Sequence, residues 1–132
     1  MTLKELSKVY YLSKEIKRDR KRLRMLRNIG VKTTKVNGMP FAVSVIYDPI
    51  GENVATIIDL ERALKRNIAK RLYEERKIMA FINNIDDCFI RLIFKLRFID
   101  CRNWYDVAKE IGGGNTSLTV RNSCYRFLKK DK

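Results

Sequence analysis

The chain has 132 residues, of which 45% are hydrophobic and 33% are charged, and its formal net charge is +14 at pH 7. This length suits one small domain with an extension, and the charge exceeds what solubility requires, which favours a polyanionic partner. No apolar run is long enough for a membrane span, and the first residues lack the hydrophobic core of a signal peptide. We therefore expect a cytoplasmic protein that does not bind membranes.

The chain has three cysteines, Cys88, Cys101 and Cys124, and no histidine. Their wide spacing argues against a disulfide framework and against a zinc site, and the lack of histidine removes the usual acid–base catalyst. The glycines at 112–114 are not followed by the Gly-Lys-Ser/Thr of a phosphate-binding loop. We predict no enzyme, no cofactor and no metal, with Cys88 and Cys124 as buried small hydrophobes and Cys101 in a loop.

Residues 2–28 are predicted to form the first helix, because leucine, isoleucine and valine recur there every three or four residues. The members of this stripe are Leu3, Leu6, Val9, Leu12, Ile16, Leu23 and Leu26. The second half of the helix is basic. Lys17, Arg18, Lys21 and Arg22 are expected to form an auxiliary surface for DNA phosphates or another acidic surface, and a merely solvated face is the alternative.

Residues 29–49 have the glycines and prolines of a linker. The segment 41–47 has the composition of a short strand, but a single strand has nothing to pair with. Pro49 suits the first turn of a following helix, with Asp48 as its cap.

Residues 50–84 are predicted to form a long helix with an apolar stripe. The stripe consists of Val54, Ile57, Leu60, Leu64, Ile68, Leu72, Met79 and Ile82. A helix of this length spans roughly 50 Å, which is more than a small C-terminal domain can cover. The stripe should therefore pair with residues 2–28 in an antiparallel hairpin or coiled coil, or with a second copy of the chain, and we expect a homodimer.

The C-terminal part, 85–132, is predicted to hold three helices. Asp86 or Asp87 caps the first, whose apolar residues are Phe89, Leu92, Ile93 and Leu96. Asn103 precedes the second helix, which buries Trp104, Val107, Ala108 and Ile111. The glycines at 112–114 make the turn. Asn115 or Thr116 caps the third helix, which buries Val120, Cys124, Phe127 and Leu128.

Two short helices around a glycine turn, with a basic second helix, are typical of a helix-turn-helix. The predicted fold is all-α, with a helical association region over 1–84 and a helix-turn-helix domain over 85–132. An ordinary helical hairpin that binds no DNA is the alternative. Our hypothesis is that the last helix enters the major groove of double-stranded DNA. The expected base-reading residues are Ser117, Leu118, Arg121 and Asn122, and the expected phosphate contacts are Thr116, Arg126, Lys129 and Lys130.

The segment Gly114–Asn122 resembles the turn and recognition helix of region four of bacterial sigma factors, and the run from Leu92 to Ala108 resembles the helices before it. The chain departs from that region at Ser117 and Leu118, where sigma factors usually carry charged base readers. More broadly, the chain resembles the ArpU/RinA-type phage transcriptional regulators. The residues that fit their pattern are Met39-Pro40-Phe41 and Ile58-Asp59-Leu60-Glu61.

The resemblance implies a regulator that activates late genes of a phage or prophage through host RNA polymerase. Two other interpretations stay open. One is a DNA-packaging protein such as a small terminase subunit, which would form a ring. The other is an adaptor that docks on RNA polymerase through its long helices without reading DNA.

Overall fold

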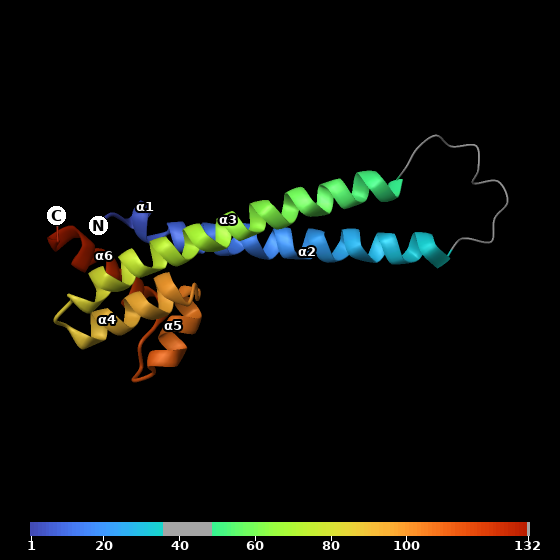
Figure 1. The fold of residues 1–132 in the computed structure, drawn as a ribbon. Helices are drawn as coiled ribbons and strands as arrows, with labels where there is room; N and C mark the ends of the chain where they lie inside the picture. Colours follow the sequence, from blue (N-terminus) through green and yellow to red (C-terminus); the bar gives the residue numbers. More distant parts are fainter. Residues whose placement is uncertain (36–48, 132) are drawn as a thin grey trace. The chain divides into compact units, whose positions relative to one another are not determined.

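The computed structural model describes the backbone of residues 1–35 and 49–131, and the side chains of 1–28 and 53–131. The described residues form helices and turns with no strand, which confirms the predicted all-α fold class (Figure 1). The helices are α1 (Leu3–Leu6), α2 (Lys8–Lys35), α3 (Pro49–Asn83), α4 (Cys88–Phe94), the π-helical segment η2 (Lys95–Ile99), α5 (Trp104–Ile111) and α6 (Ser117–Lys130). The candidate strand at 41–47 and the candidate cap Asp48 lie outside the described residues.

The predicted helix 2–28 differs from the structure at both ends. It starts with a capping box, in which Glu5 N–H donates to Thr2 Oγ1 at 3.3 Å and Thr2 N–H donates to Glu5 Oε2 at 2.7 Å. The hydrogen bonds that Glu5 Oε2 accepts from Thr2 N–H and, at 3.1 Å, from the Thr2 hydroxyl lower the pKa of the Glu5 carboxyl. The helix is interrupted at Ser7, whose hydroxyl donates to the Leu3 carbonyl at 2.8 Å and so competes with regular helical bonding.

The helix also continues to Lys35, beyond the predicted end at residue 28. The prediction ended it before Gly30, but a glycine inside a helix costs only about 1 kcal/mol relative to alanine. The next residue that forbids a helix is Pro40. The predicted helix 50–84 agrees closely with α3, which has Pro49 at its first position.

The chain divides into two compact units, which are described separately. The core unit contains Met1–Ser13 and Lys70–Lys132, and the hairpin unit contains Lys14–Ala69. The boundaries of the units therefore fall inside α2 and α3, not at residue 84/85 as expected from the sequence. The reason is that the first turns of α2 and the end of α3 pack with the C-terminal helices.

In the hairpin unit, parts of α2 and α3 run antiparallel, as predicted (Figure 1). Ile16 and Leu23 of α2 are buried, and the Arg27 guanidinium lies 2.6 Å from a Glu61 carboxylate oxygen of α3. In the core unit, Lys8 of α2 lies 3.6 Å from Glu74 of α3. The stripe on α3 is less regular than expected, because Leu72 is 50% exposed.

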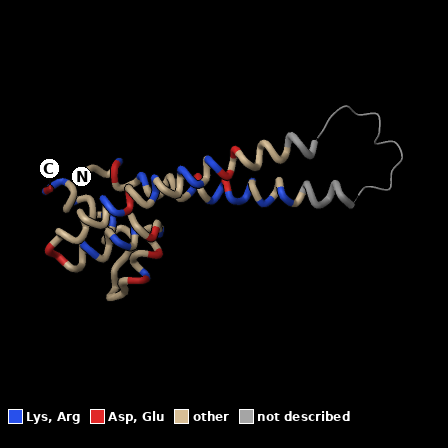
Figure 2. Tube along the Cα trace, viewed as in Figure 1, with Lys and Arg blue, Asp and Glu red and all other residues tan. Residues whose placement is uncertain are grey.

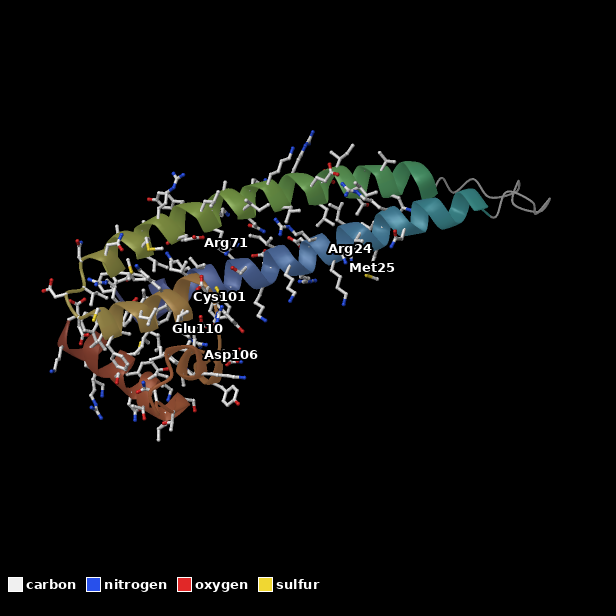
Figure 3. All side chains as sticks on the ribbon, turned by 90° about the horizontal axis from the view of Figure 1, so that it is seen from below. Arg24, Met25, Arg71, Cys101, Asp106 and Glu110 are labelled. Carbon is white, nitrogen blue, oxygen red and sulfur yellow. The ribbon has the colours of Figure 1, made fainter. Side chains whose placement is uncertain are left out.

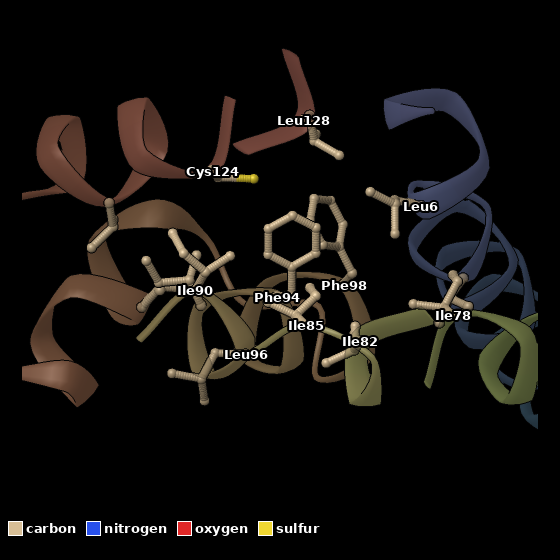
Figure 4. Close-up of a cluster of buried hydrophobic side chains, with 14 of the residues drawn as sticks. Leu6, Ile78, Ile82, Ile85, Ile90, Phe94, Leu96, Phe98, Cys124 and Leu128 are labelled. Carbon is tan, nitrogen blue, oxygen red and sulfur yellow. The ribbon is translucent and has the colours of Figure 1, made fainter. Parts of the chain in front are cut away.

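The buried side chains of the core unit surround Phe94 of α4 (Figure 4). The centroid of its ring lies 5.2 Å from that of Phe98, 5.5 Å from that of Phe127 and 6.2 Å from that of Phe81. Aromatic side chains therefore join α3, α4, η2 and α6 in one cluster. Fully buried aliphatic residues from these elements and from α1, α2 and α5 complete the core: Leu6, Val9, Ile78, Ile82, Ile93, Val107 and Val120.

The predicted apolar face of α4 is wrong in part. Asp87 caps this helix through its side chain, as expected, but Leu92 is 43% exposed, while Ile90, Ile93 and Phe94 are buried. The register changes after Phe94, where the Asp100 N–H donates to the Lys95 carbonyl, five residues back, at 3.0 Å. This π-helical turn brings both Leu96 and Phe98 into the core, which an α-helical pattern does not predict.

We predict a large difference in stability between two neighbouring substitutions on α4. Ile93→Ala should lower the free energy of unfolding by about 2–5 kcal/mol, because it leaves a cavity in a fully buried site. Leu92→Ala, the matched control, should cost less than about 1 kcal/mol, because much of Leu92 is already in water. Urea unfolding followed by circular dichroism measures both. Equal losses would contradict the observed register of α4.

Candidate nucleic-acid interface

The turn between α5 and α6 is built from three consecutive glycines in the left-handed half of backbone space. Their φ angles are +68° at Gly112, +65° at Gly113 and +76° at Gly114. Residues with a Cβ rarely adopt such angles, so the sequence Gly-Gly-Gly is what permits this turn. The Asn115 side-chain amide donates to the Gly112 carbonyl at 2.8 Å and closes the turn.

The helices on either side of the turn start at the predicted caps. The Asn103 side chain accepts a hydrogen bond from Asp106 N–H at 2.8 Å, and the Thr116 hydroxyl accepts one from Thr119 N–H at 3.2 Å. Asn115, the alternative cap, belongs to the turn instead. The α5–turn–α6 segment is thus a helix-turn-helix with both N-termini satisfied by side chains.

The inner face of α6 follows the prediction. Val120 and Cys124 are fully buried, Leu128 is nearly so, and Phe127 is half-buried against Phe94. Burial raises the pKa of the Cys124 thiol to about 12. Cys88 was predicted to be buried, but it is exposed because it is the first residue of α4, directly after the Asp87 cap.

The four expected base-reading residues lie on the outer side of α6. Ser117, Leu118 and Arg121 are exposed, with Leu118 at 56%, and Asn122 is half-buried. No hydrogen bond or ion pair involving the side chains of these four is present among the described residues. Their hydroxyl, guanidinium and amide groups are therefore free to meet an external partner.

The four expected phosphate contacts are exposed as well, but Thr116 differs from the other three. Its hydroxyl caps α6 and lies 2.8 Å from the Thr119 hydroxyl, so its oxygen is already used within the helix. Arg126, Lys129 and Lys130 form no ion pair within the described part of the chain. Asp131, just beyond α6, pairs with the terminal amine of Met1 at 3.9 Å.

The charge of α6 is of one sign. The helix carries four basic residues and no acidic residue between Ser117 and Lys130. Lys129 and Lys130 lie in its last turn, where positive charge also interacts favourably with the helix dipole. Acidic residues do occur on α5, where Figure 3 labels Asp106 and Glu110, and Glu110 is paired with Arg102 at 2.6 Å.

Residues outside α6 also border its outer face, and they were not among the site residues predicted from the sequence. A hollow beside its N-terminal half is lined by Asn103, Trp104, Tyr105, Ser117, Leu118 and Arg121. The Arg97 guanidinium lies 4.6 Å from the centroid of the Trp104 ring. The Tyr125 ring meets the Trp104 ring edge-on, with 6.1 Å between the two ring centroids. Tyr105 remains exposed. Tyr105, an exposed aromatic residue two positions after the Asn103 cap, was the available signal for this edge.

A second hollow borders the C-terminal half of α6. It is lined by Leu3, Asn122, Tyr125, Arg126 and Lys129. The N-terminal helix α1 therefore lies beside α6. Nothing in the local sequence pattern indicates this contact, because the two segments lie at opposite ends of the chain.

No family model, curated protein or solved structure matches this chain. The resemblance to sigma-factor region four and to ArpU/RinA-type regulators therefore stays a prediction. Among the helices that the structure describes, none is both long enough and apolar enough to cross a membrane.

We predict that Cys88 of the folded chain reacts much faster than Cys124 with iodoacetamide at about pH 8, where ordinary thiols begin to ionise. Cys88 should be modified rapidly because it is exposed, whereas Cys124 should remain unmodified because it is buried and its pKa is raised. Peptide mass spectrometry identifies each modified site. The denatured chain, in which all three thiols react, is the control, and rapid modification of Cys124 in the folded chain would contradict the orientation of α6.

Proposed function

We propose that this chain is a sequence-specific regulator of transcription that binds double-stranded DNA by inserting α6 into the major groove. One observation carries the proposal: α6 has one face buried around Cys124 and an opposite face of exposed polar and basic side chains. A helix held in this way presents its outer side chains at fixed positions, as base reading requires.

The residue types on the outer face support separate roles. Arg121 and Asn122 have side chains that form two hydrogen bonds with guanine and with adenine, respectively. Leu118 supplies apolar contact for a thymine methyl group, and the Ser117 hydroxyl donates to or accepts from either kind of base. Arg126, Lys129 and Lys130 supply the positive charge that holds phosphates and fixes the position of the helix on the duplex.

The regulatory part of the proposal comes from the resemblance. We propose that the chain activates late genes of a phage or prophage, through host RNA polymerase, in a bacterial cytoplasm. The expected homodimer also stays a prediction. Within a single chain, α2 and α3 already pair with each other, so their apolar stripes have a partner without a second copy. A packaging protein would instead form a closed ring, which the mass of the particle in solution would reveal.

In the first step of the experiment, the full chain is mixed with a pool of random-sequence duplexes, and the duplexes that it binds are recovered and sequenced. Arg121→Ala and Asn122→Ala are then titrated against a selected duplex and a scrambled one. Each substitution should weaken binding to the selected duplex by roughly 5- to 150-fold, because a good base contact contributes about 1–3 kcal/mol of discrimination. Binding to the scrambled duplex should change far less.

Arg76→Ala, which removes one exposed charge from α3, is the matched control and should leave the preference for the selected duplex unchanged. Two outcomes would count against the proposal. One is that the unaltered chain enriches no sequence, which would favour an adaptor that does not read DNA. The other is that Arg121→Ala and Asn122→Ala weaken binding to both duplexes by the same factor.

A further inference from the structure

A second strongly basic surface lies on α2 in the hairpin unit. It consists of Lys17, Arg18, Lys21, Arg22 and Arg24, and is called the α2 basic surface below. All five side chains are exposed, and none forms an ion pair with a described residue. Figure 2 shows the predominance of basic residues along this part of α2.

The acid within this stretch of α2, Asp19, lies on a different side of the helix from the α2 basic surface. Ile16 and Leu23 are buried, and Asp19 is half-buried between them in the sequence at helical spacing, so this acid lies on the inner side of the helix. Arg27 pairs with Glu61 of α3. Arg27 is thus paired, whereas the five side chains of the α2 basic surface form no ion pair with an acid of the described residues.

The density of charge on this surface matches that of a nucleic acid. Residues 17 to 24 rise about 10 Å along the helix axis and carry six positive charges and one negative charge. Their net charge of five is roughly one charge per 2 Å. Duplex DNA carries one negative charge per about 1.7 Å of its axis. Like charges four residues apart, such as Lys17 with Lys21, also destabilise a helix unless a counter-charge is present.

The surface fits a phosphate backbone better than a protein partner. Stable protein interfaces have an apolar or aromatic centre. Among the described side chains of this part of α2, Met25 is the one large apolar residue that is exposed, at 56%. Figure 3 shows Met25 on the side of α2 that faces away from α3.

We propose that the α2 basic surface binds the phosphates of double-stranded DNA without reading their sequence. This inference rests on the proposed function and extends it, because it assigns affinity without specificity to α2 and sequence preference to α6. The predicted consequence is a binding constant that depends more steeply on salt than the contacts of α6 alone would give, since each neutralised phosphate releases counterions.

The test compares two triple variants of the full chain. Lys17→Gln, Arg18→Gln and Lys21→Gln remove three charges from the α2 basic surface, while Arg62→Gln, Lys65→Gln and Arg66→Gln remove three exposed charges from α3 in the same unit. Glutamine has a helix propensity close to those of lysine and arginine, and circular dichroism verifies that both variants remain folded. Binding to a random-sequence duplex and to a selected duplex is measured at several salt concentrations.

The α2 variant should reduce the slope of the logarithm of the binding constant against the logarithm of salt concentration. The expected reduction is roughly 0.9 for each phosphate that the variant no longer neutralises, and so roughly 3 for the three substitutions together. Its affinity should fall by the same factor on both duplexes. The α3 variant should change the slope by less than about 1. Equal slopes for the two variants would show a general effect of net charge and would overturn the inference.

The remaining outcomes separate this inference from the proposed function. If the unaltered chain prefers its selected duplex and the α2 variant keeps the full salt slope, the α2 inference fails and the proposed function stands. If that variant instead loses binding to purified bacterial RNA polymerase, the surface docks a protein. If the unaltered chain binds neither duplex, both proposals fail.

Discussion

The packing of aromatic rings around Phe94 is the interaction on which the rest of the core unit depends. Phe81, Phe98 and Phe127 contact it from α3, η2 and α6, so residues far apart in the sequence meet at one side chain. This cluster holds α6 by its inner face. Because that face is apolar, the polar and basic residues of α6 must point outward, and the proposed recognition surface is a consequence of how the core is packed.

Two basic surfaces follow from the same sorting of side chains, one on α6 and one on α2. They differ in chemistry. The outer face of α6 mixes an amide, a hydroxyl, a leucine and basic groups, which is the variety that discrimination between bases requires. The α2 basic surface consists wholly of lysine and arginine, which hold phosphates but carry no information about sequence. Affinity and specificity are therefore proposed to reside on separate units of the chain.

Local patterns in the sequence predicted most of the helices, the cap Asn103 and the inner face of α6, because each depends on neighbours within a few residues. They placed the caps Asp87 and Thr116 to within one residue, since Asp86 and Asn115 were equal alternatives. They missed the break of the first helix at Ser7 and its continuation to Lys35. The face of α4 was predicted wrongly, since a π-helical turn at η2 changes the register without a signature in the spacing of apolar residues. The position of α1 beside α6 was also missed. Periodicity shows which side of a helix is apolar, but it does not show which other helix will cover it.

Site-specific photo-crosslinking tests most directly whether the outer face of α6 meets DNA. A photoreactive phenylalanine analogue replaces Leu118 on α6 or, as a control, Leu92 on α4, since both are exposed leucines of the core unit. Each full-length variant is irradiated with a selected duplex. We predict that the analogue at position 118 crosslinks to bases within the selected sequence and that the analogue at position 92 does not. Crosslinking from position 92 alone, or equally from both positions, would contradict the account.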